Sequence, residues 1–585
     1  MFKKLFLLPL LLGVLLVFVL ACNRSVSSST AGQDFPIDGG SEPVAGALPG
    51  QRGYVRRPVS FRWHMNYTWA SPSTWGNDTV SRHWGDMFNI HANMTSPDAI
   101  ADEVLNLMIM ANDLPDAIWM ERGAMNIEMT RMGLFYSVDE LTAMVGSNWY
   151  HENVPAATQA HYAVDGVNHV IPNWVRMGTF GVPGGATGGN HAWMYVTKVY
   201  EALGSPQFVR FEDLYDYAVR VRDSNFTNHA GLPIIPIIFN GGPNYGQELV
   251  RNIFMSYGGM MDGWGGWYDI HPNGTFGSSW ENPIWRDAVL EANRWFREGL
   301  FPATMLTQSQ AEFEELLLGG RGGLIYHDHS SDDSNNFRRI IGEQDPGNSV
   351  EVVRYDAGVR HTLFLPARGL AHLDIAHQTH ATFGWNGSFI TRGASDPGRI
   401  FELMTWMLSP MGSIEMTLGP QGVLWNQLDA NGYPIMARSP LSLTADERTS
   451  IGLWTWDLKG HANNVDNAKF AANRGLPPEQ RNWVESMQEL YFTPNLMLSD
   501  EFINMIPQID SLSDLGIART LIQDHFEEML PQIILAPTAD AAVAMFNSVV
   551  AFANANGIQQ INAVYDANWR RNSELQGGSI FQGRW

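Results

Sequence analysis

The sequence predicts an α/β fold divided into two lobes, and two features of the chain support this prediction. Strand-like stretches alternate with stretches of helical periodicity along most of the sequence, as they do in α/β proteins. The chain has 585 residues, of which 45% are hydrophobic, whereas a single hydrophobic core stops growing near ~250–300 residues. We therefore expect two cores, each with its own strands and helices.

The first predicted elements are a strand, a helix and a second strand. Residues 59–65 alternate in the way of a half-buried strand and open into an aromatic loop that holds Trp69 and Trp75. A helix is expected over residues 98–110, because apolar side chains recur there at helical spacing. After a Pro-Asp turn, residues 117–120 form a short apolar strand. This succession is typical of α/β folds.

Three residues at the end of the second strand are candidates for a binding site. Open α/β sheets bind ligands in the loops at the carboxyl ends of their strands. This rule places Trp119, Glu121 and Arg122 at the edge of a cleft. The alternative for Trp119 is a place in the core, because it directly follows apolar residues.

The same alternation continues in the later part of the chain. Residues 211–222 read as an amphipathic helix, residues 232–239 as a buried strand and residues 288–296 as another helix. Asp396 followed by Pro397 predicts the start of a further helix, with Asp396 as the N-cap and Pro397 in the first turn.

The N-terminal segment has the pattern of a secretory signal. A charged start, an apolar run and a small residue precede Cys22, which is the only cysteine of the chain. This order matches a bacterial lipoprotein signal, so we expect cleavage after residues 1–21 and acylation, for example by palmitate, of the Cys22 thiol. An uncleaved membrane anchor is the alternative. Both predict an extracytoplasmic protein held at the membrane, with residues 22–57, rich in Gly, Pro and Ser, as a flexible tether.

Charge and aromatic content narrow the class of partner. The formal net charge of −23 disfavours nucleic acid and anionic lipid. The chain holds 21 Trp, 17 Tyr and 29 Phe, and an indole ring stacks on a sugar ring while its N–H group stays free to hydrogen-bond. A carbohydrate ligand is therefore favoured, although most of the Trp residues must serve in packing.

Short motifs follow one another in an order that resembles a known family. They lie at residues 111–118, 164–172, 193–204, 298–300, 318–323, 396–408 and 419–425. In this order, behind a lipoprotein signal, they resemble the sugar-binding lipoproteins of ABC importers that are related to maltose-binding protein. The resemblance spans most of residues 58–570. It implies a type II periplasmic-binding-protein fold, in which two α/β lobes joined by a hinge close over a ligand.

The resemblance also implies that the chain crosses between the lobes more than once. We expect the N-terminal α/β lobe to hold residues 58–175 and 350–395. The C-terminal α/β lobe is then expected to hold residues 176–349 and 396–585.

The candidate ligand contacts are mostly aromatic residues in loops and in segments that the resemblance places between the lobes. Trp264 and Trp267 stand between glycines, so they form either a stacking platform or a loop packed on its own lobe. The full set is Trp69, Trp75, Trp119, Glu121, Arg122, Trp174, Tyr245, Trp264, Trp267, His327, Trp385 and Trp425.

Motifs for catalysis or metal binding are scarce. The sequence contains no signature of a zinc protease, a serine hydrolase or a phosphate-binding loop. The densest cluster of possible metal ligands lies at residues 327–333, after a predicted strand. The resemblance favours a ligand contact by His327 over a metal site, and a solvated loop is the alternative. We expect no metal and no cofactor.

These observations predict a monomeric, non-enzymatic, lipid-anchored receptor. It captures a carbohydrate, specifically an oligosaccharide, between its lobes and delivers it to the transmembrane subunits of an ABC permease. The alternatives are a secreted carbohydrate-active enzyme of the glycoside hydrolase type and a surface scaffold without a transport role. Carboxylate pairs suited to glycoside hydrolysis do not decide between them, because 60 acidic residues always supply some pair.

Overall fold

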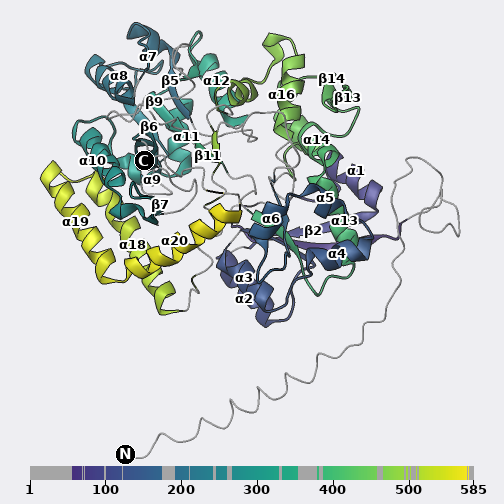
Figure 1. The fold of residues 1–585 in the computed structure, drawn as a ribbon. Helices are drawn as coiled ribbons and strands as arrows, with labels where there is room; N and C mark the ends of the chain where they lie inside the picture. Colours follow the sequence, from purple (N-terminus) through teal and green to yellow (C-terminus); the bar gives the residue numbers. More distant parts are fainter. Residues whose placement is uncertain are drawn as a thin grey trace, which may run out of the picture.

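A computed structural model of the chain has two α/β lobes, each built on one main sheet. In Figure 1 the elements of the first sheet lie on the right and those of the second on the left. The residues that the structure describes are 56–68, 70, 73–97, 100–121, 123–173, 175, 192–209, 211–240, 246–257, 259, 267–327, 332–353, 378–380, 386–456, 465–492, 496–498, 501, 509, 513–575 and 578.

The first sheet has the strand order β2-β1-β3-β12-β4. Its strands are β1 (Val59–Met65), β2 (Ile90–Thr95), β3 (Ala117–Glu121), β4 (Ile171–Pro172) and β12 (Asn386–Ile390). β1 runs parallel to β2 and β3, whereas β12 runs antiparallel to β3 and β4. The carboxyl ends of β1, β3 and β4 and the amino end of β12 therefore meet at one edge. The strands predicted at residues 59–65 and 117–120 are confirmed.

Helices cover both faces of the first sheet. They are α1 (Thr79–Phe88), α2 (Ala101–Met110), α3 (Ala124–Arg131), α4 (Val138–Val145), α5 (Trp149–Asn153), α6 (Ala156–Tyr162), α13 (Pro397–Leu408) and α14 (Pro410–Leu418). The face that carries Trp63 and Ala117 packs against α1, α4 and α13. The opposite face, with Ile118 and Phe389, packs against Leu105 of α2 and Met129 of α3. Successive strand residues point to opposite faces, so this alternation divides the sheet between two apolar layers.

The second sheet has the strand order β10-β5-β9-β6. Its strands are β5 (Ala192–Val196), β6 (Ile235–Phe239), β9 (Gly322–His327) and β10 (Val350–Val352). β6 is parallel to β9, and β5 is antiparallel to both β9 and β10. The helices of this part of the chain are α7 (Thr197–Ala202), α8 (Phe211–Ser224), α9 (Gln247–Ser256), α10 (Pro283–Arg297), α11 (Gln310–Leu318) and α12 (Asp332–Gln344).

Three C-terminal helices complete the second core. These are α18 (Asp514–Ile534), α19 (Ala539–Ala555) and α20 (Ile558–Leu575), drawn in yellow and yellow-green in Figure 1. Phe526 of α18 and Phe546 of α19 pack against Trp280, and Tyr565 of α20 packs against Tyr268. The second core is therefore closed by residues more than two hundred positions away in the sequence.

The remaining elements are short. The small strands are β7 (Tyr268–Ile270), β8 (Phe276–Ser278), β11 (Gln378–His380), β13 (Trp425–Leu428), β14 (Pro434–Met436) and β15 (Leu496–Leu498). The small helices are η1 (Ser279–Glu281), η2 (Ala303–Leu306), η4 (Pro440–Ser442), α15 (Ala445–Ile451), α16 (Val465–Gly475), η6 (Pro478–Gln480), α17 (Trp483–Met487) and η7 (Gln488–Phe492).

The packing differs from the expected division of the chain at two places. β10, at 350–352, was expected in the first lobe but pairs with β5 in the second sheet. The helices at 397–418 were expected in the second lobe, yet Ile400 and Met404 lie in the core of the first sheet. Helical periodicity predicts that one face of a helix is buried but does not indicate which sheet buries it.

Within the described ranges no single helix is both long and apolar enough to cross a membrane. Among the described helices, only α19 and α20 taken together, as a pair bent at the break between them, have the length and apolar composition of a membrane span.

Candidate functional site

The carboxyl edge of the first sheet gathers several of the predicted site residues. β1 ends at Met65, β3 at Glu121 and β4 at Pro172, and β12 begins beside them at Asn386. Ligands of open α/β sheets bind beyond this kind of edge. Arg122, Trp174 and Trp385 are the sequence neighbours of Glu121, Asn173 and Asn386.

Trp119 lies under this edge in a small apolar cluster. Its side chain is 0% exposed, stands in register with Met65 and has the ring of Tyr67 at 4.4 Å between centroids. The backbone N–H of Asn66 donates to the carbonyl of Trp119 at 2.8 Å, which holds the loop above β3. The structure therefore places Trp119 in the core, which was the alternative to a ligand contact. Tyr67 packs on the indole, and no face of the indole is open to a ligand in this conformation.

A row of polar residues follows the apolar cluster on the same face of the sheet. Glu121, which is exposed, stands in register with Asn386, and the backbone N–H of Asn173 donates to the carbonyl of Asn386 at 3.2 Å. The backbone N–H of Asn386 in turn donates to Oδ1 of Asn173 at 3.2 Å. Residues directly opposite on paired strands share a face. Both asparagines are 0% exposed, so this edge combines buried amides with an exposed carboxylate.

Two further polar groups stand at the end of β1. Asn66 donates from Nδ2 to Oδ1 of Asp102 on α2 at 2.9 Å. His64 is buried, with Nδ1 at 3.1 Å from Oγ1 of Thr95. Burial lowers the pKa of His64, and a hydrogen bond with Asn66 opposes this only in part, so the imidazole is neutral at pH 7.

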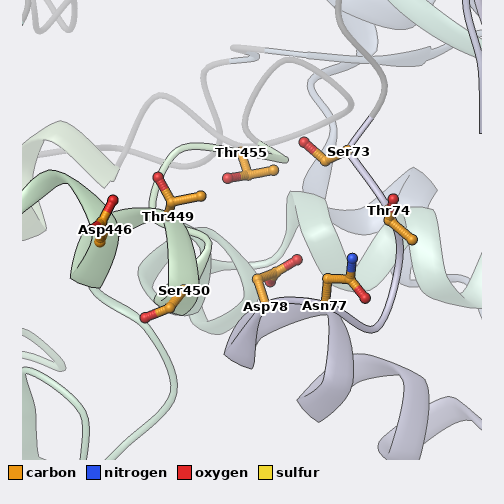
Figure 2. Close-up of a pocket in the computed structure, with 8 residues that line it drawn as sticks. All are labelled: Ser73, Thr74, Asn77, Asp78, Asp446, Thr449, Ser450 and Thr455. Atoms are coloured by element: carbon orange, nitrogen blue, oxygen red, sulfur yellow. The ribbon is translucent and has the colours of Figure 1, made fainter.

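A polar pocket lies beside the start of α1 (Figure 2). Its volume is about 370 Å³, and it is lined by Ser73, Thr74, Asn77, Asp78, Asp446, Thr449, Ser450 and Thr455. In Figure 2 Asn77 and Asp78 stand on one side of the space, and Thr449 and Ser450 of α15 stand on the other. The last turn of α1 lies next to the amino end of β2, so the start of α1 points towards the carboxyl side of the sheet. The pocket therefore lies on the side at which open α/β sheets generally bind ligands.

The local sequence explains how this pocket is held. Asp78 caps α1 by accepting a hydrogen bond from the backbone N–H of Ser81 at 2.8 Å, and its Oδ1 also accepts one from the indole of Trp456 at 3.3 Å. Gly452 has φ +85° and approaches Asp78 so closely that a Cβ would collide with the carboxylate. Glycine at this turn lets α15 close against α1.

The lining of the pocket determines the kind of ligand that it suits. None of the described residues that line the pocket is aromatic or basic, so its side chains offer hydroxyl, amide and carboxylate groups only. Such groups hydrogen-bond to sugar hydroxyls but provide no surface for stacking. The residues that line this pocket therefore do not supply the aromatic stacking that the sequence predicts.

Besides Trp119, three of the predicted tryptophans are buried: Trp75, Trp267 and Trp425. Trp75 was expected to contact a ligand from a loop, but it is 4% exposed, donates from Nε1 to the carbonyl of Ile90 at 3.2 Å and stands edge-on to Trp456. Trp267 packs with Trp280 and Trp285 in the second core, as the own-lobe alternative predicted.

Trp425 is also buried, and its environment is a separate small cluster. Its indole donates to the carbonyl of Gly419 at 2.8 Å, and its ring packs with Ile414 of α14 and Ala468 of α16. For Trp75, Trp267 and Trp425 the expectation of a stacking surface is not met in this conformation, because each side chain is buried.

The second sheet has an edge of the same kind. β6 ends at Phe239 and β9 at His327, opposite the first residue of β5. Asn240 follows β6 and donates from Nδ2 to Oε1 of Gln310 at 2.6 Å. Its Oδ1 is buried and has no hydrogen-bond partner among the described residues. Polar groups therefore stand at corresponding edges of both sheets.

Several predicted residues lie outside the part of the chain that the structure describes. They are Cys22, Trp69, Arg122, Trp174, Tyr245, Trp264 and Trp385, and for His327 only the backbone is described. Within the described part, no group of three or more His, Cys, Asp or Glu side chains is placed to hold a metal ion.

Sequence reasoning missed the two buried asparagines at the first edge and the polar pocket. Asn173 and Asn386 directly adjoin Trp174 and Trp385, which were chosen for their aromatic rings. The signal available in the sequence was an amide directly beside each of these tryptophans.

Comparison with known proteins establishes the fold. The chain is similar to the alginate-binding protein AlgQ2, with a TM-score of 0.61 and 15% identity over 88% of this chain and 98% of that one. It is also similar to the Streptococcus pneumoniae ABC-transporter substrate-binding protein FusA, solved as an EF-hand mutant in complex with fructo-nystose. The TM-score is 0.61 and the identity is 15%, over 88% of this chain and 99% of that one. An HMO-binding solute-binding protein from Bifidobacterium longum infantis is similar as well, with a TM-score of 0.58 and 15% identity over 89% of this chain and 100% of that one.

These likenesses define the class of fold to which the chain belongs. It has the two-lobed α/β fold of the type II periplasmic-binding-protein class, as the sequence predicted. No family model and no curated protein matches the chain.

Proposed function

We propose that the chain is an extracytoplasmic solute-binding protein that captures an oligosaccharide between its lobes and delivers it to an ABC permease. The observation that carries the proposal is the pair of polar strand edges, one on each sheet, in a fold whose solved examples bind solutes. AlgQ2 is named for alginate, FusA is in complex with fructo-nystose, and the Bifidobacterium protein is named for HMO binding. These names share a class of ligand without sharing one sugar, so they support the class alone.

The proposed binding region extends from the carboxyl edge of the first sheet to that of the second. The polar pocket beside α1 would accept sugar hydroxyls from the first lobe, and Asn240 would do so from the second. Residues at or beside these edges in the sequence remain proposed contacts: Trp69, Glu121, Arg122, Trp174, Tyr245, His327 and Trp385. Trp264 also remains a proposed contact, because it stands between glycines as a possible stacking platform. Closure of the two lobes would dry the site and strengthen its hydrogen bonds.

A thermal-shift screen tests the binding step. A ligand that binds only the folded state stabilises it by mass action, so a saturating oligosaccharide should raise the melting temperature. Calorimetric titration of each hit then gives an affinity and a stoichiometry of one per chain. The same samples, analysed for products after overnight incubation, distinguish a receptor from a glycoside hydrolase, because a receptor returns its ligand unchanged.

We further propose that the protein is held at the membrane by acylation of Cys22. The signal-like segment before this cysteine supports the proposal. Cys22→Ser should release the protein from the membrane fraction or arrest its processing. Membrane retention together with normal processing of this variant would contradict lipid anchoring.

A further inference from the structure

Asn386 carries a buried carboxamide that the fold itself does not use. The residue is 0% exposed, and neither Nδ2 nor Oδ1 has a hydrogen-bond partner among the described residues. Its backbone, by contrast, is fully engaged, because its N–H and its carbonyl both bond to Asn173. The unused group is therefore the side chain alone, at the first residue of β12.

An amide in this state is unusual. Buried polar side chains nearly always find a partner, and leaving one unsatisfied destabilises the folded protein. Replacing such a group by an apolar side chain of the same shape is neutral or stabilising. The fold would therefore gain from Leu at this position, so the amide indicates a requirement other than folding.

The surroundings of Asn386 restrict what can satisfy it. On the same face of the sheet its neighbours are Glu121, Asn173 and Ser388, which are acidic or neutral. A carboxylate on a ligand could accept from Nδ2 but would leave Oδ1 without a donor and would meet Glu121. Two adjacent sugar hydroxyls supply a donor and an acceptor together, which matches a carboxamide.

We propose that Asn386 is a specificity-determining residue that binds a pair of neighbouring hydroxyls on an uncharged sugar unit. This inference rests on the proposed function and adds to it that the ligand unit at this edge is a neutral glycan rather than a uronate. Because the carboxamide is fully covered in this conformation, the atoms above it must shift when the ligand enters.

The test combines affinity with stability in one variant, Asn386→Leu. Maltotriose, kestose, xylotriose and mannotriose serve as neutral probes, and trigalacturonate serves as the charged one. We expect the wild type to bind at least one neutral probe and to prefer it to trigalacturonate. In Asn386→Leu the affinity for that probe should fall at least tenfold, while the melting temperature without ligand stays equal or rises. Asn386→Ser, which is smaller, provides a second variant if Leu prevents folding, and the same loss of affinity is expected.

Asn568→Leu is the matched control. Asn568 is buried in α20 of the second core, and its Nδ2 also has no partner among the described residues. Its replacement should change the melting temperature without changing the affinity. Equal affinity of Asn386→Leu and wild type, a preference for trigalacturonate, or a fall in melting temperature that accounts for the lost binding would each overturn the inference while leaving the proposed function in place. If the wild type binds none of the probes, both the inference and the proposed function are contradicted.

Discussion

The indole nitrogen of Trp84 donates a hydrogen bond of 2.8 Å to Oε2 of Glu415, a residue 331 positions further along the chain. The same carboxylate accepts from Nε1 of Trp406 at 3.2 Å, and Nε2 of His83 lies 3.1 Å from its other oxygen. Glu415 is buried, so these contacts replace its hydration. These contacts join α14 to α1. They help to explain why the helices at 397–418 pack against the first sheet.

We expect Glu415→Ala to destabilise the protein by about 3 kcal/mol, because it leaves two indole N–H groups without an acceptor. Urea unfolding followed by tryptophan fluorescence measures the loss. Glu128→Ala, on the exposed surface of α3, is the control and should change stability by less than about 0.5 kcal/mol. Similar losses in the two variants would show that the Glu415 contacts contribute little.

A second prediction concerns the buried carboxyl of Asp269. Burial raises its pKa from 3.8 to about 8, and hydrogen bonds with Asn282 and Ser279 oppose this only in part. His271 lies 3.6 Å away, but burial lowers the pKa of its imidazole, so the two side chains are both neutral near pH 7 and do not form an ion pair.

The sign of the pH effect follows from linkage. Between about pH 4 and pH 8 the folded state keeps the proton on Asp269 while the unfolded state releases it, so stability falls as pH rises through this window. Asp269→Asn removes the titrating group. We expect it to raise the melting temperature at pH 8 more than at pH 5, measured by calorimetry across this range. An equal shift at both values would contradict ionisation of Asp269 as the cause.

Trp119→Ala tests the position of this side chain in the core. Removal of a fully buried indole leaves a cavity, and we expect a loss of about 3–5 kcal/mol. Trp119→Phe, which keeps a ring beside Tyr67, should cost less. Chemical denaturation gives both values. A melting temperature unchanged in Trp119→Ala, together with weaker sugar binding, would return Trp119 to the list of ligand contacts.

Gly452→Ala tests how the polar pocket is closed. Alanine at this turn is strained by the positive φ and collides with Asp78. Gly432→Ala is the matched control, because Gly432 has φ +81° and open space around it. We expect both variants to lose about 1 kcal/mol from backbone strain and Gly452→Ala to lose about 1–3 kcal/mol more. Equal losses would show that the close approach to Asp78 is not required.

Local patterns in the sequence predicted the elements well. The helix expected over 211–222 is α8, the strand expected over 232–239 contains β6, and the helix expected over 288–296 lies within α10. α13 begins at Pro397 with Asp396 at the N-cap position, but the Asp396 side chain makes no capping bond and pairs with Arg57 at 2.5 Å instead. The sequence predicts the helix start from the residue type at position 396. It does not predict that Arg57, from a distant segment, competes with the helix for the Asp396 carboxylate.

Local sequence patterns could not predict which aromatic residues are buried. Trp75 follows a strand in a loop, and nothing local indicates that Trp456 packs edge-on to it. The expected division between lobes was wrong at 350–352 and 397–418 for the same reason, because packing between segments far apart in the sequence decides which sheet each of them joins. The unsatisfied amide of Asn386 becomes visible only when its neighbours are in place.

The central claim is that the chain is a receptor that closes on an oligosaccharide, and the most direct test is calorimetric titration combined with small-angle scattering of the same sample. We predict saturable binding of a neutral oligosaccharide with one site per chain and a decrease in the radius of gyration on saturation, with the sugar recovered intact. Hydrolysis of the sugar, or no heat of binding and no compaction with any oligosaccharide in the panel, would contradict it.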